Sequence, residues 1–223
     1  MKSFFYLCLL FTCFACSNSP EFETGEIKTL SLVTEALNQL DKPMVFLDAR
    51  KLTNRHLIDK ANTPVLFVEL ETGQNGTLTQ YPGQGIGQTW LAADGATITF
   101  EQGVLKASRG MGNDVMGGET SMPTWSKING GAFYKRTLGY LEGNNHIQTL
   151  EYDCKIRKDG KKQIITIWEV EFTVISYEES CDSKNYPIKN TYLVENNQIV
   201  RKSYQFHSPT LGYIVTERLD RLN

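Results

Sequence analysis

The chain has 223 residues and a formal net charge of -2, and 40% of its residues are hydrophobic and 11% aromatic. This length suits one domain or two small ones, and the apolar content supplies an ordinary core, which excludes disorder over most of the chain. Lysine and arginine total 23 against 25 aspartates and glutamates, so the basic excess typical of nucleic-acid-binding proteins is missing and nucleic acid is not an expected partner.

Residues 1–15 have the features of a signal peptide. Lys2 gives a short basic start, and an apolar run of about 12 residues follows, which is too short to span a bilayer. Ala15 is a small residue suited to the last position before cleavage, and Cys16 comes directly after it. Cys13 is a competing cleavage position, but Thr12 precedes it and suits cleavage less well. The pattern predicts an exported protein.

A cysteine at the new N-terminus followed by a short polar tether, residues 16–21, is typical of bacterial lipoproteins. We therefore predict lipidation at Cys16, because two or more acyl chains hold a protein firmly on a membrane. Asn18 is not the aspartate that retains lipoproteins in the inner membrane of enteric bacteria, which favours the outer membrane. The alternative is a simple secretory signal peptide whose cysteines are apolar filler.

Two cysteines remain in the exported part of the chain. Cys8 and Cys13 leave with the signal peptide and Cys16 carries the lipid, so Cys154 and Cys181 are left in an oxidising compartment. Such a pair predicts a disulfide. A metal site is the alternative, but no histidine lies near the two cysteines at ligand spacing, so we predict no metal.

The N-terminal part of the mature chain is predicted to contain one or two helices. Residues 25–40 carry apolar side chains every three or four positions, which indicates an amphipathic helix that Pro43 ends. A second short helical turn is predicted over residues 53–60. Such a helix could dock on a partner helix, but packing on its own domain is the commoner role.

Strands follow these helices. Residues 64–71 form an apolar strand, Asn75-Gly76 predicts a hairpin turn, and residues 77–81 return. The glycines within residues 82–88 lack the full spacing of a dinucleotide-binding loop and precede a strand, so no nucleotide cofactor is expected. Residues 88–109 then read as three strands joined at Asp94-Gly95 and at Gln102-Gly103. Glycines from 110 to 118 are expected to break the pattern as a flexible loop.

The C-terminal half consists of alternating segments separated by turn residues. We predict strands over residues 132–140, 146–156, 163–177, 190–195, 198–207 and 211–219, with turns at Asn144-Asn145, Asp159-Gly160, Asn196-Asn197 and Pro209. Consecutive hairpins indicate antiparallel sheets. The predicted fold is mainly β, with antiparallel hairpins and meanders packed as a sandwich or part-closed barrel and one or two short N-terminal helices. We expect a single domain over residues 22–223.

Motifs in both halves of the chain point to a known family. The first group is Trp90, Asp94-Gly95, Gly103-Val104-Leu105, Arg109-Gly110-Met111 and Asp114; the second is Tyr177-Glu178-Glu179-Ser180-Cys181, Asn190-Thr191-Tyr192, Ser203-Tyr204-Gln205 and Pro209. In this order, and over nearly all of residues 26–220, the chain resembles the YjbF family of lipoproteins, which includes the group 4 capsule lipoproteins. The family pattern leads us to expect a second aromatic residue after Tyr192, and Leu193 departs from that pattern.

The resemblance implies an outer-membrane lipoprotein that faces the periplasm and acts as an accessory component of capsular or exopolysaccharide secretion. Its implied partners are polysaccharide export proteins, including an outer-membrane β-barrel, with the polysaccharide itself as a further candidate. The alternatives are a periplasmic polysaccharide-modifying hydrolase and a purely structural envelope lipoprotein.

The residues themselves offer weak candidates for catalysis. Ser203, His207 and Asp220 form a triad on paper only, because no nucleophile-elbow motif surrounds the serine. Glu169 and Glu171 face the same way and resemble a glycosidase pair, but two carboxylates on a strand are more often a solvated face. We therefore predict that the protein is not an enzyme and uses no cofactor.

Aromatic and basic residues offer a possible glycan-binding surface. Trp90, Trp125, Tyr134, Tyr140 and Trp168 could stack on sugar rings, and Arg109, Lys135 and Arg136 could pair with uronic acids. Core packing is the competing role for Trp168 and Tyr140, and a structural ion pair with Asp114 is the competing role for Arg109. Trp125, in a glycine- and proline-containing stretch, is the aromatic we expect to be most exposed. The predicted binding residues are Trp90, Arg109, Asp114 and Trp125.

Overall fold

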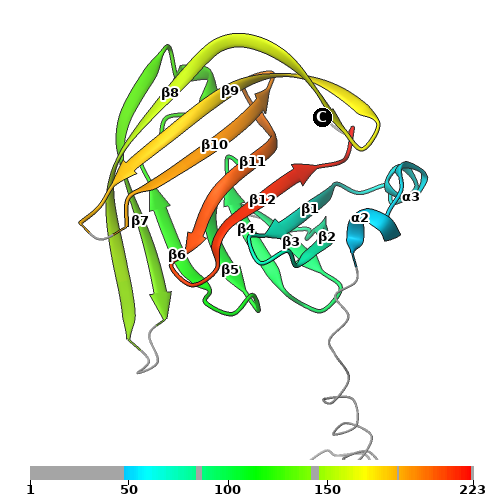
Figure 1. The fold of residues 1–223 in the computed structure, drawn as a ribbon, viewed down its shortest axis with the longest axis horizontal. Helices are drawn as coiled ribbons and strands as arrows, with labels where there is room; N and C mark the ends of the chain where they lie inside the picture. Colours follow the sequence, from blue (N-terminus) through cyan, green and yellow to red (C-terminus); the bar gives the residue numbers. More distant parts are fainter. Residues whose placement is uncertain (1–47, 84–86, 142–145, 185, 222–223) are drawn as a thin grey trace, which may run out of the picture. The chain divides into compact units, whose positions relative to one another are not determined.

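The structure, a computed structural model, describes residues 48–83, 87–141, 146–184 and 186–221 (Figure 1). These residues belong to one unit of the chain, Phe46–Asn223. The predicted signal peptide, the tether with Cys16, the predicted helix over residues 25–40 and the predicted turn at Asn144-Asn145 lie outside the described residues.

Two short helices precede the first strand. In α2, Ala49–Leu52, the side chain of Asp48 accepts a hydrogen bond from the amide of Arg50, and in α3, Arg55–Lys60, the side chain of Asn54 accepts one from the amide of Leu57. Aspartate and asparagine begin helices well because they pair amides that the first turn leaves free. The predicted helical turn over residues 53–60 is confirmed as α3. No helix among the described residues is long and apolar enough to cross a membrane.

Twelve strands form one antiparallel sheet in the order β5-β4-β3-β2-β1-β12-β11-β10-β9-β8-β7-β6. Their bounds are β1 Val65–Leu70, β2 Asn75–Gln80, β3 Gln88–Ala92, β4 Thr97–Glu101, β5 Val104–Arg109, β6 Val115–Thr120, β7 Gly131–Leu141, β8 Ile147–Ile167, β9 Val170–Asp182, β10 Ile188–Glu195, β11 Ile199–Ser208 and β12 Gly212–Arg218, and the short 3-10 helix η1, Trp125–Lys127, lies between β6 and β7. The sheet curls into a nearly closed barrel (Figure 1). The predicted fold class is confirmed, in its barrel form.

The two end strands of the sheet, β5 and β6, meet at a seam. Arg109 of β5 donates to the carbonyl oxygens of Val115 and Met116 in β6, at 3.0 Å each. A methyl group on Gly118 would lie 3.1 Å from the carbonyl oxygen of Lys106, so β6 approaches β5 closely because this residue has no side chain. The seam is therefore closed by side-chain hydrogen bonds and close packing in place of a strand ladder.

The inner face of the barrel carries the larger hydrophobic core. Alternate residues of each strand point inward, as the period of two requires, so that Leu66, Val68, Leu78, Trp90 and Ile98 line one side. Facing them are buried side chains of the β7–β12 wall. Buried polar and charged side chains share this interior, which makes it unusual for a protein core.

A second core lies outside the barrel, where the tip of the β8–β9 hairpin covers β1 and the helices (Figure 1). Its fully buried members are Ala49, Ile58, Val65, Phe67, Ile167, Phe172, Val174 and Leu219. β1 is consequently buried on both faces, with Leu66 and Val68 inside and Val65 and Phe67 outside. This explains why β1 reads as a continuous apolar run and not as an alternating one.

The turn between β1 and β2 corrects the sequence prediction. Asn75 and Gly76 pair with Glu69 and Val68 as the first residues of β2, so they do not form the turn. The turn lies over residues 71–74, where Gly73 has a φ of +87° and donates to the carbonyl oxygen of Leu70. Gly73 supplies the positive φ that the sequence predicts for the Asn75-Gly76 pair.

Two further turn predictions were wrong for a related reason. Asp159-Gly160 lies inside β8, where the register with β9 shifts between Lys158 and Lys162, so the glycine marks a bulge. The hairpin turn falls instead at Trp168 and Glu169, with φ values of +48° and +70°. The predicted loop at Gly117 and Gly118 is also wrong, because both residues belong to β6. By contrast, the predicted turns at Asp94-Gly95, Gln102-Gly103 and Asn196-Asn197 are confirmed.

Candidate functional site

A buried carboxylate organises the polar part of the interior. Glu179 of β9 is 1% exposed and pairs with Arg136 of β7, whose Nη1 lies 3.2 Å from Oε2. The hydroxyls of Tyr134 and Tyr192 and the side-chain amide of Asn190 also donate to this carboxylate. A buried ion pair is tolerable only when its remaining hydrogen-bonding positions are filled, and here four donors fill them.

The environment of Glu179 perturbs its neighbours in a consistent way. Burial, and then the adjacent carboxylate, raise the pKa of both Tyr134 and Tyr192 above the usual range. Burial alone would lower the pKa of Arg136, but the carboxylate of Glu179 raises it overall. The tyrosines therefore remain neutral donors and Arg136 remains a cation.

This Glu179 cluster also ties opposite walls of the barrel together. The second amino group of Arg136 donates to the carbonyl oxygen of Leu105 in β5 at 3.2 Å. The side-chain oxygen of Asn190 accepts from the amide of Phe206 at 2.7 Å, and Gln205 bonds the amide of Leu105 at 2.9 Å. All these groups use their hydrogen-bonding capacity within the protein, which indicates a structural role.

The disulfide lies beside this cluster. Cys154 of β8 and Cys181 of β9 are direct cross-strand partners, and their sulfurs are bonded, as the sequence predicts. One carboxylate oxygen of Glu179 and the two sulfurs lie within 4.8 Å of one another, which is a spacing that metal sites use. Because each sulfur is bonded to the other, neither is the thiolate that a metal would require.

The three residues of the paper triad do not meet. Ser203 bonds Thr216 at 2.6 Å, and the carboxylate of Asp220 is held by Arg218. His207 bonds Ser108 of β5 instead, with 3.0 Å between Nε2 and Oγ. The triad hypothesis is therefore wrong in its geometry.

The contact between His207 and Ser108 brings together residues that sequence reasoning did not pair. Ser108 donates to Asp114 at 2.8 Å and accepts from the amide of Val115 at 3.0 Å, so its hydroxyl joins the two sides of the seam. Burial lowers the pKa of His207 to about 4, and its Nδ1 has no hydrogen-bond partner among the described residues. Both side chains are almost completely buried, so a substrate has no access to the serine.

The two predicted binding tryptophans are buried. Trp125 is 2% exposed, its indole donates to the carbonyl oxygen of Gln102 at 2.8 Å, and its ring packs against Tyr177 and Tyr192. The expectation that Trp125 is exposed is therefore wrong. Glycine and proline around it signalled an irregular backbone, which η1 provides, but they carry no information on where the side chain points. Trp90 is also 2% exposed and lies on the inner face of β3.

Arg109 and Asp114 both hold the seam, but they do not pair with each other. The carboxylate of Asp114 accepts hydrogen bonds from the amides of Gly110 and Met111 and from the hydroxyl of Ser108. The guanidinium of Arg109 donates instead to main-chain carbonyl oxygens. The ion pair considered as the alternative to a binding role for Arg109 is therefore not formed. Arg109 is exposed, and its role in binding stays a prediction.

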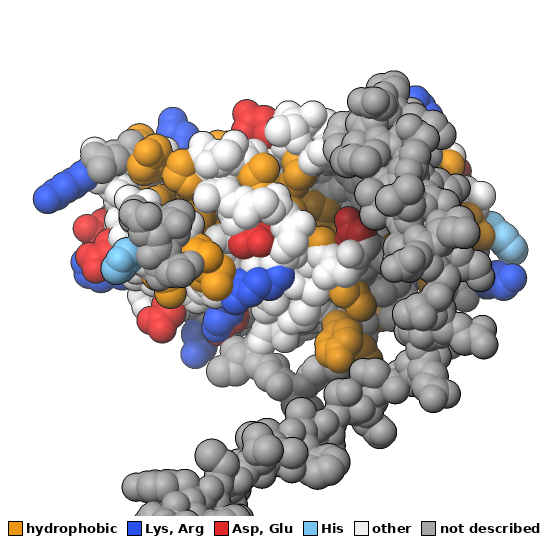
Figure 2. Space-filling model, turned by 90° about the horizontal axis from the view of Figure 1, so that it is seen from below, with side chains coloured by type: hydrophobic (Ala, Val, Ile, Leu, Met, Phe, Trp, Pro, Cys, Tyr) orange, Lys and Arg blue, Asp and Glu red, His pale blue; other side chains and the backbone are white. Residues whose placement is uncertain are grey.

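Several surface cations that could pair with uronic acids already have carboxylate partners. Lys135 pairs with Asp153 at 2.9 Å, Arg157 with Glu178 at 2.6 Å, and Lys202 with Glu217 at 2.9 Å. Figure 2 shows basic and acidic side chains beside one another on one described face. Glu169 and Glu171, the proposed glycosidase pair, are exposed at and next to the hairpin turn and line none of the described pockets.

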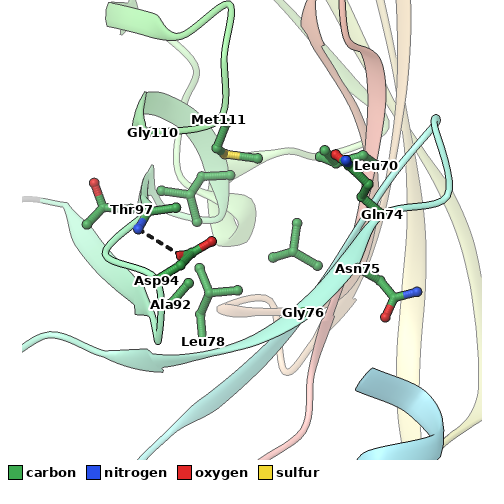
Figure 3. A pocket seen from close by; sticks show the side chains of 13 residues that line it. Leu70, Gln74, Asn75, Gly76, Leu78, Ala92, Asp94, Thr97, Gly110 and Met111 are labelled. Carbon is green, nitrogen blue, oxygen red and sulfur yellow. Dashed lines mark hydrogen bonds between the residues drawn. The ribbon is translucent and has the colours of Figure 1, made fainter. Parts of the chain in front are cut away.

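Pockets open at both ends of the β1–β4 wall. The apolar pocket, about 290 Å³, is walled by Val68, Leu70, Leu78, Ile98 and Met111, with Asp94 at its rim bonded to the amide of Ala96 (Figure 3). The glutamine pocket, about 550 Å³, is lined at the other end by Gln80, Gln88, Gln102, Gln198, Trp90 and Arg218. A third pocket, of about 710 Å³, lies over β7 and β8 beside residues 182–184. Of the predicted binding residues, only Trp90 lines one of these pockets.

Comparison with known proteins adds evidence on ancestry. A family model described as group 4 capsule polysaccharide lipoprotein gfcB, YjbF, matches residues 36–219. The crystal structure of the hypothetical lipoprotein YmcC from Escherichia coli K12 has a similar fold, with a TM-score of 0.68 and 16% identity, over 91% of this chain and 100% of that chain. At that identity the likeness shows the fold alone. No curated protein sequence matches the chain.

Proposed function

Because this chain belongs to the YjbF family of group 4 capsule polysaccharide lipoproteins, we propose that it is an accessory component of capsular or exopolysaccharide secretion. It acts there by binding or as a scaffold, beside polysaccharide export proteins that include an outer-membrane β-barrel. The observation that carries the proposal is the family match over residues 36–219, which includes every strand of the barrel.

Anchoring is part of the same proposal. The signal peptide ends at Ala15, Cys16 carries the lipid, and the barrel faces the periplasm from the outer membrane. The support is the sequence pattern around Cys16 together with a family and a structural relative that are both described as lipoproteins. Intact mass spectrometry of the native protein should give the mass of an acylated N-terminal cysteine. A mature terminus elsewhere, without lipid mass, contradicts this part.

A role without chemistry is supported by what the candidate catalytic residues do. The three residues of the paper triad form hydrogen bonds to three different partners and not to one another. The hydroxyl of Ser108 is buried at the seam. Glu169 and Glu171 point into solvent at the tip of the hairpin. Each set serves folding or solvation, and none surrounds a cavity where a reacting bond would fit.

Deletion and complementation test the proposal. A strain lacking the protein should show less surface polysaccharide, wild-type protein should restore it, and a Cys16→Ser form should be mislocalised and restore little. The double variant Glu169→Gln/Glu171→Gln should restore as well as the wild type. Normal surface polysaccharide in the deletion strain contradicts the proposed function.

The hydrolase alternative has a separate test. Purified protein is incubated with the cognate polysaccharide, and chain length and acetyl content are followed. We expect neither to change. Cleavage or deacetylation that a single carboxylate substitution abolishes would establish an enzyme instead.

A further inference from the structure

The glutamine pocket is open to solvent, and its side-chain amides are hydrogen-bonding groups that the described part of the protein does not use. Four side-chain amides line it: Gln80 of β2, Gln88 of β3, Gln102 of the β4–β5 turn and Gln198 beside the β10–β11 turn. Within the part of the chain that the structure describes, none of these amides makes a hydrogen bond to another protein group. Gln205, buried nearby, instead bonds Leu105, Gly103 and Ser203.

The rim of this pocket is preorganised. Gln102 and Gly103 form a turn with φ values of +53° and +81°, and the carbonyl oxygens of both residues accept side-chain hydrogen bonds, from Trp125 and Gln205 respectively. A methyl group on Gly103 would lie 2.2 Å from Val200, so the β4–β5 turn packs tightly on the start of β11. The fixed turn holds the backbone from which Gln102 projects, which lowers the cost of ordering this part of the pocket when a ligand binds.

The pocket contains one charged side chain, and that charge is compensated. Arg218 of β12 lies 5.9 Å from the ring centre of Trp90 and directs its Nε and one amino group to the carboxylate of Asp220, at 3.0 and 3.1 Å. Its other amino group is still able to donate. An anionic ligand would therefore find no unpaired cation here, whereas an uncharged ligand with several hydroxyls would find donors and acceptors.

We propose that the glutamine pocket binds an uncharged sugar residue of the secreted polysaccharide. Each amide offers one acceptor and two donor hydrogens, which match neighbouring sugar hydroxyls. The nearly buried indole of Trp90 lies at the base of the pocket, where its signal can report on a ligand. The volume of about 550 Å³ falls within the range of roughly 300–1,000 Å³ typical of small-molecule sites. The inference deepens the proposed function and rests on it for the origin of the sugar.

The test uses the indole signals of the protein itself. The native mature lipoprotein, labelled with ¹⁵N in its tryptophan indoles and held in detergent, is titrated with the methyl glycosides of glucose, galactose, mannose and N-acetylglucosamine, and with glucuronic and galacturonic acids. We expect at least one neutral glycoside to shift the Trp90 signal, assigned with Trp90→Phe. Trp168, at the hairpin tip outside the barrel, is the internal control and should not shift.

Matched variants locate the binding. Gln88→Leu and Gln198→Leu should each weaken binding about 2- to 10-fold, the effect of one lost hydrogen bond. Gln148→Leu, an exposed glutamine on β8, should leave it unchanged. The inference is overturned if no probe shifts Trp90, if only the uronic acids do, or if both pocket variants bind like wild type. Those results leave the proposed function standing, because it fails only if deletion leaves surface polysaccharide unchanged.

Discussion

The two cores of this protein, one inside the barrel and one beneath the β8–β9 hairpin, are built on different physical principles. The inner core contains the ion pair of Arg136 and Glu179 and a buried histidine, and its strands are joined by side-chain hydrogen bonds. The outer core is an apolar cluster, and the buried charged side chain of Arg201, which lies 4.3 Å from the ring centre of Phe172, is paired with Glu195 at its edge. The stability of the inner core should therefore depend on hydrogen-bond partners and on pH, and that of the outer core mainly on packed volume.

The largest expected effect comes from breaking the inner ion pair. Glu179→Ala leaves the guanidinium of Arg136 buried without its carboxylate and should lower the free energy of unfolding by roughly 4 kcal/mol. Urea denaturation measures this. The control is Glu178→Ala, the next residue along β9, whose exposed pair with Arg157 should contribute less than about 1 kcal/mol. Equal losses for the two variants would contradict the distinction.

The outer core should respond to lost volume. Phe172→Ala removes a buried ring beneath the hairpin and should lower the free energy of unfolding by about 3 kcal/mol. Phe133→Ala, on the exposed face of β7, should change it by no more than about 0.5 kcal/mol. The Phe172→Ala loss should also be the same at pH 7 and pH 5, and a strong pH dependence would show that the two cores are not independent.

The inner core should carry the pH dependence. The pKa of His207 is about 4 in the folded state and 6.5 in the unfolded reference, so its contribution is complete above pH 6.5 and is lost as the pH falls toward 4. At pH 5 the loss should be about 2 kcal/mol. His207→Gln, compared with wild type by urea denaturation at pH 7 and pH 5, should flatten this dependence. Identical pH profiles for the two proteins would show that another group is responsible.

The smallest expected effect lies at the tip of the hairpin. Glu169 has a φ of +70°, a conformation that glycine adopts without steric cost, so Glu169→Gly should raise the free energy of unfolding by about 1 kcal/mol. Asn197→Gly, at the corresponding turn position of the β10–β11 hairpin, should gain less, because asparagine tolerates this conformation. A loss of stability in Glu169→Gly would show that its side chain stabilises the turn.

The strands were predictable from the sequence because their inner and outer residues alternate. The turns were predictable only where a single turn dipeptide stood between two strands. Asn75-Gly76 and Asp159-Gly160 misled because glycine also serves within strands and at bulges. The turn at Trp168 and Glu169 contains no residue that is typical of turns. Its side chains instead contact the outer core, where the ring of Trp168 packs against Phe67, and such contacts cannot be read from the local sequence.

The candidate site was much less predictable than the fold. Ser108 and His207 are 99 residues apart, and Glu179 gathers donors from β7 and β10, so only the closure of the barrel brings these groups together. The glutamine pocket was missed for the same reason: its four amides come from four separate segments. Trp90, the one predicted binding residue in it, was identified through the family motif and not through its environment.

Affinity capture of the native lipoprotein from detergent-solubilised envelopes tests the central claim most directly. Polysaccharide export proteins, including an outer-membrane β-barrel, should be enriched with the wild type and much less with Cys16→Ser, which is expected to lose its place at the membrane. If those proteins are absent from the wild-type capture, or equally enriched with both forms, an anchored accessory role in polysaccharide secretion is contradicted.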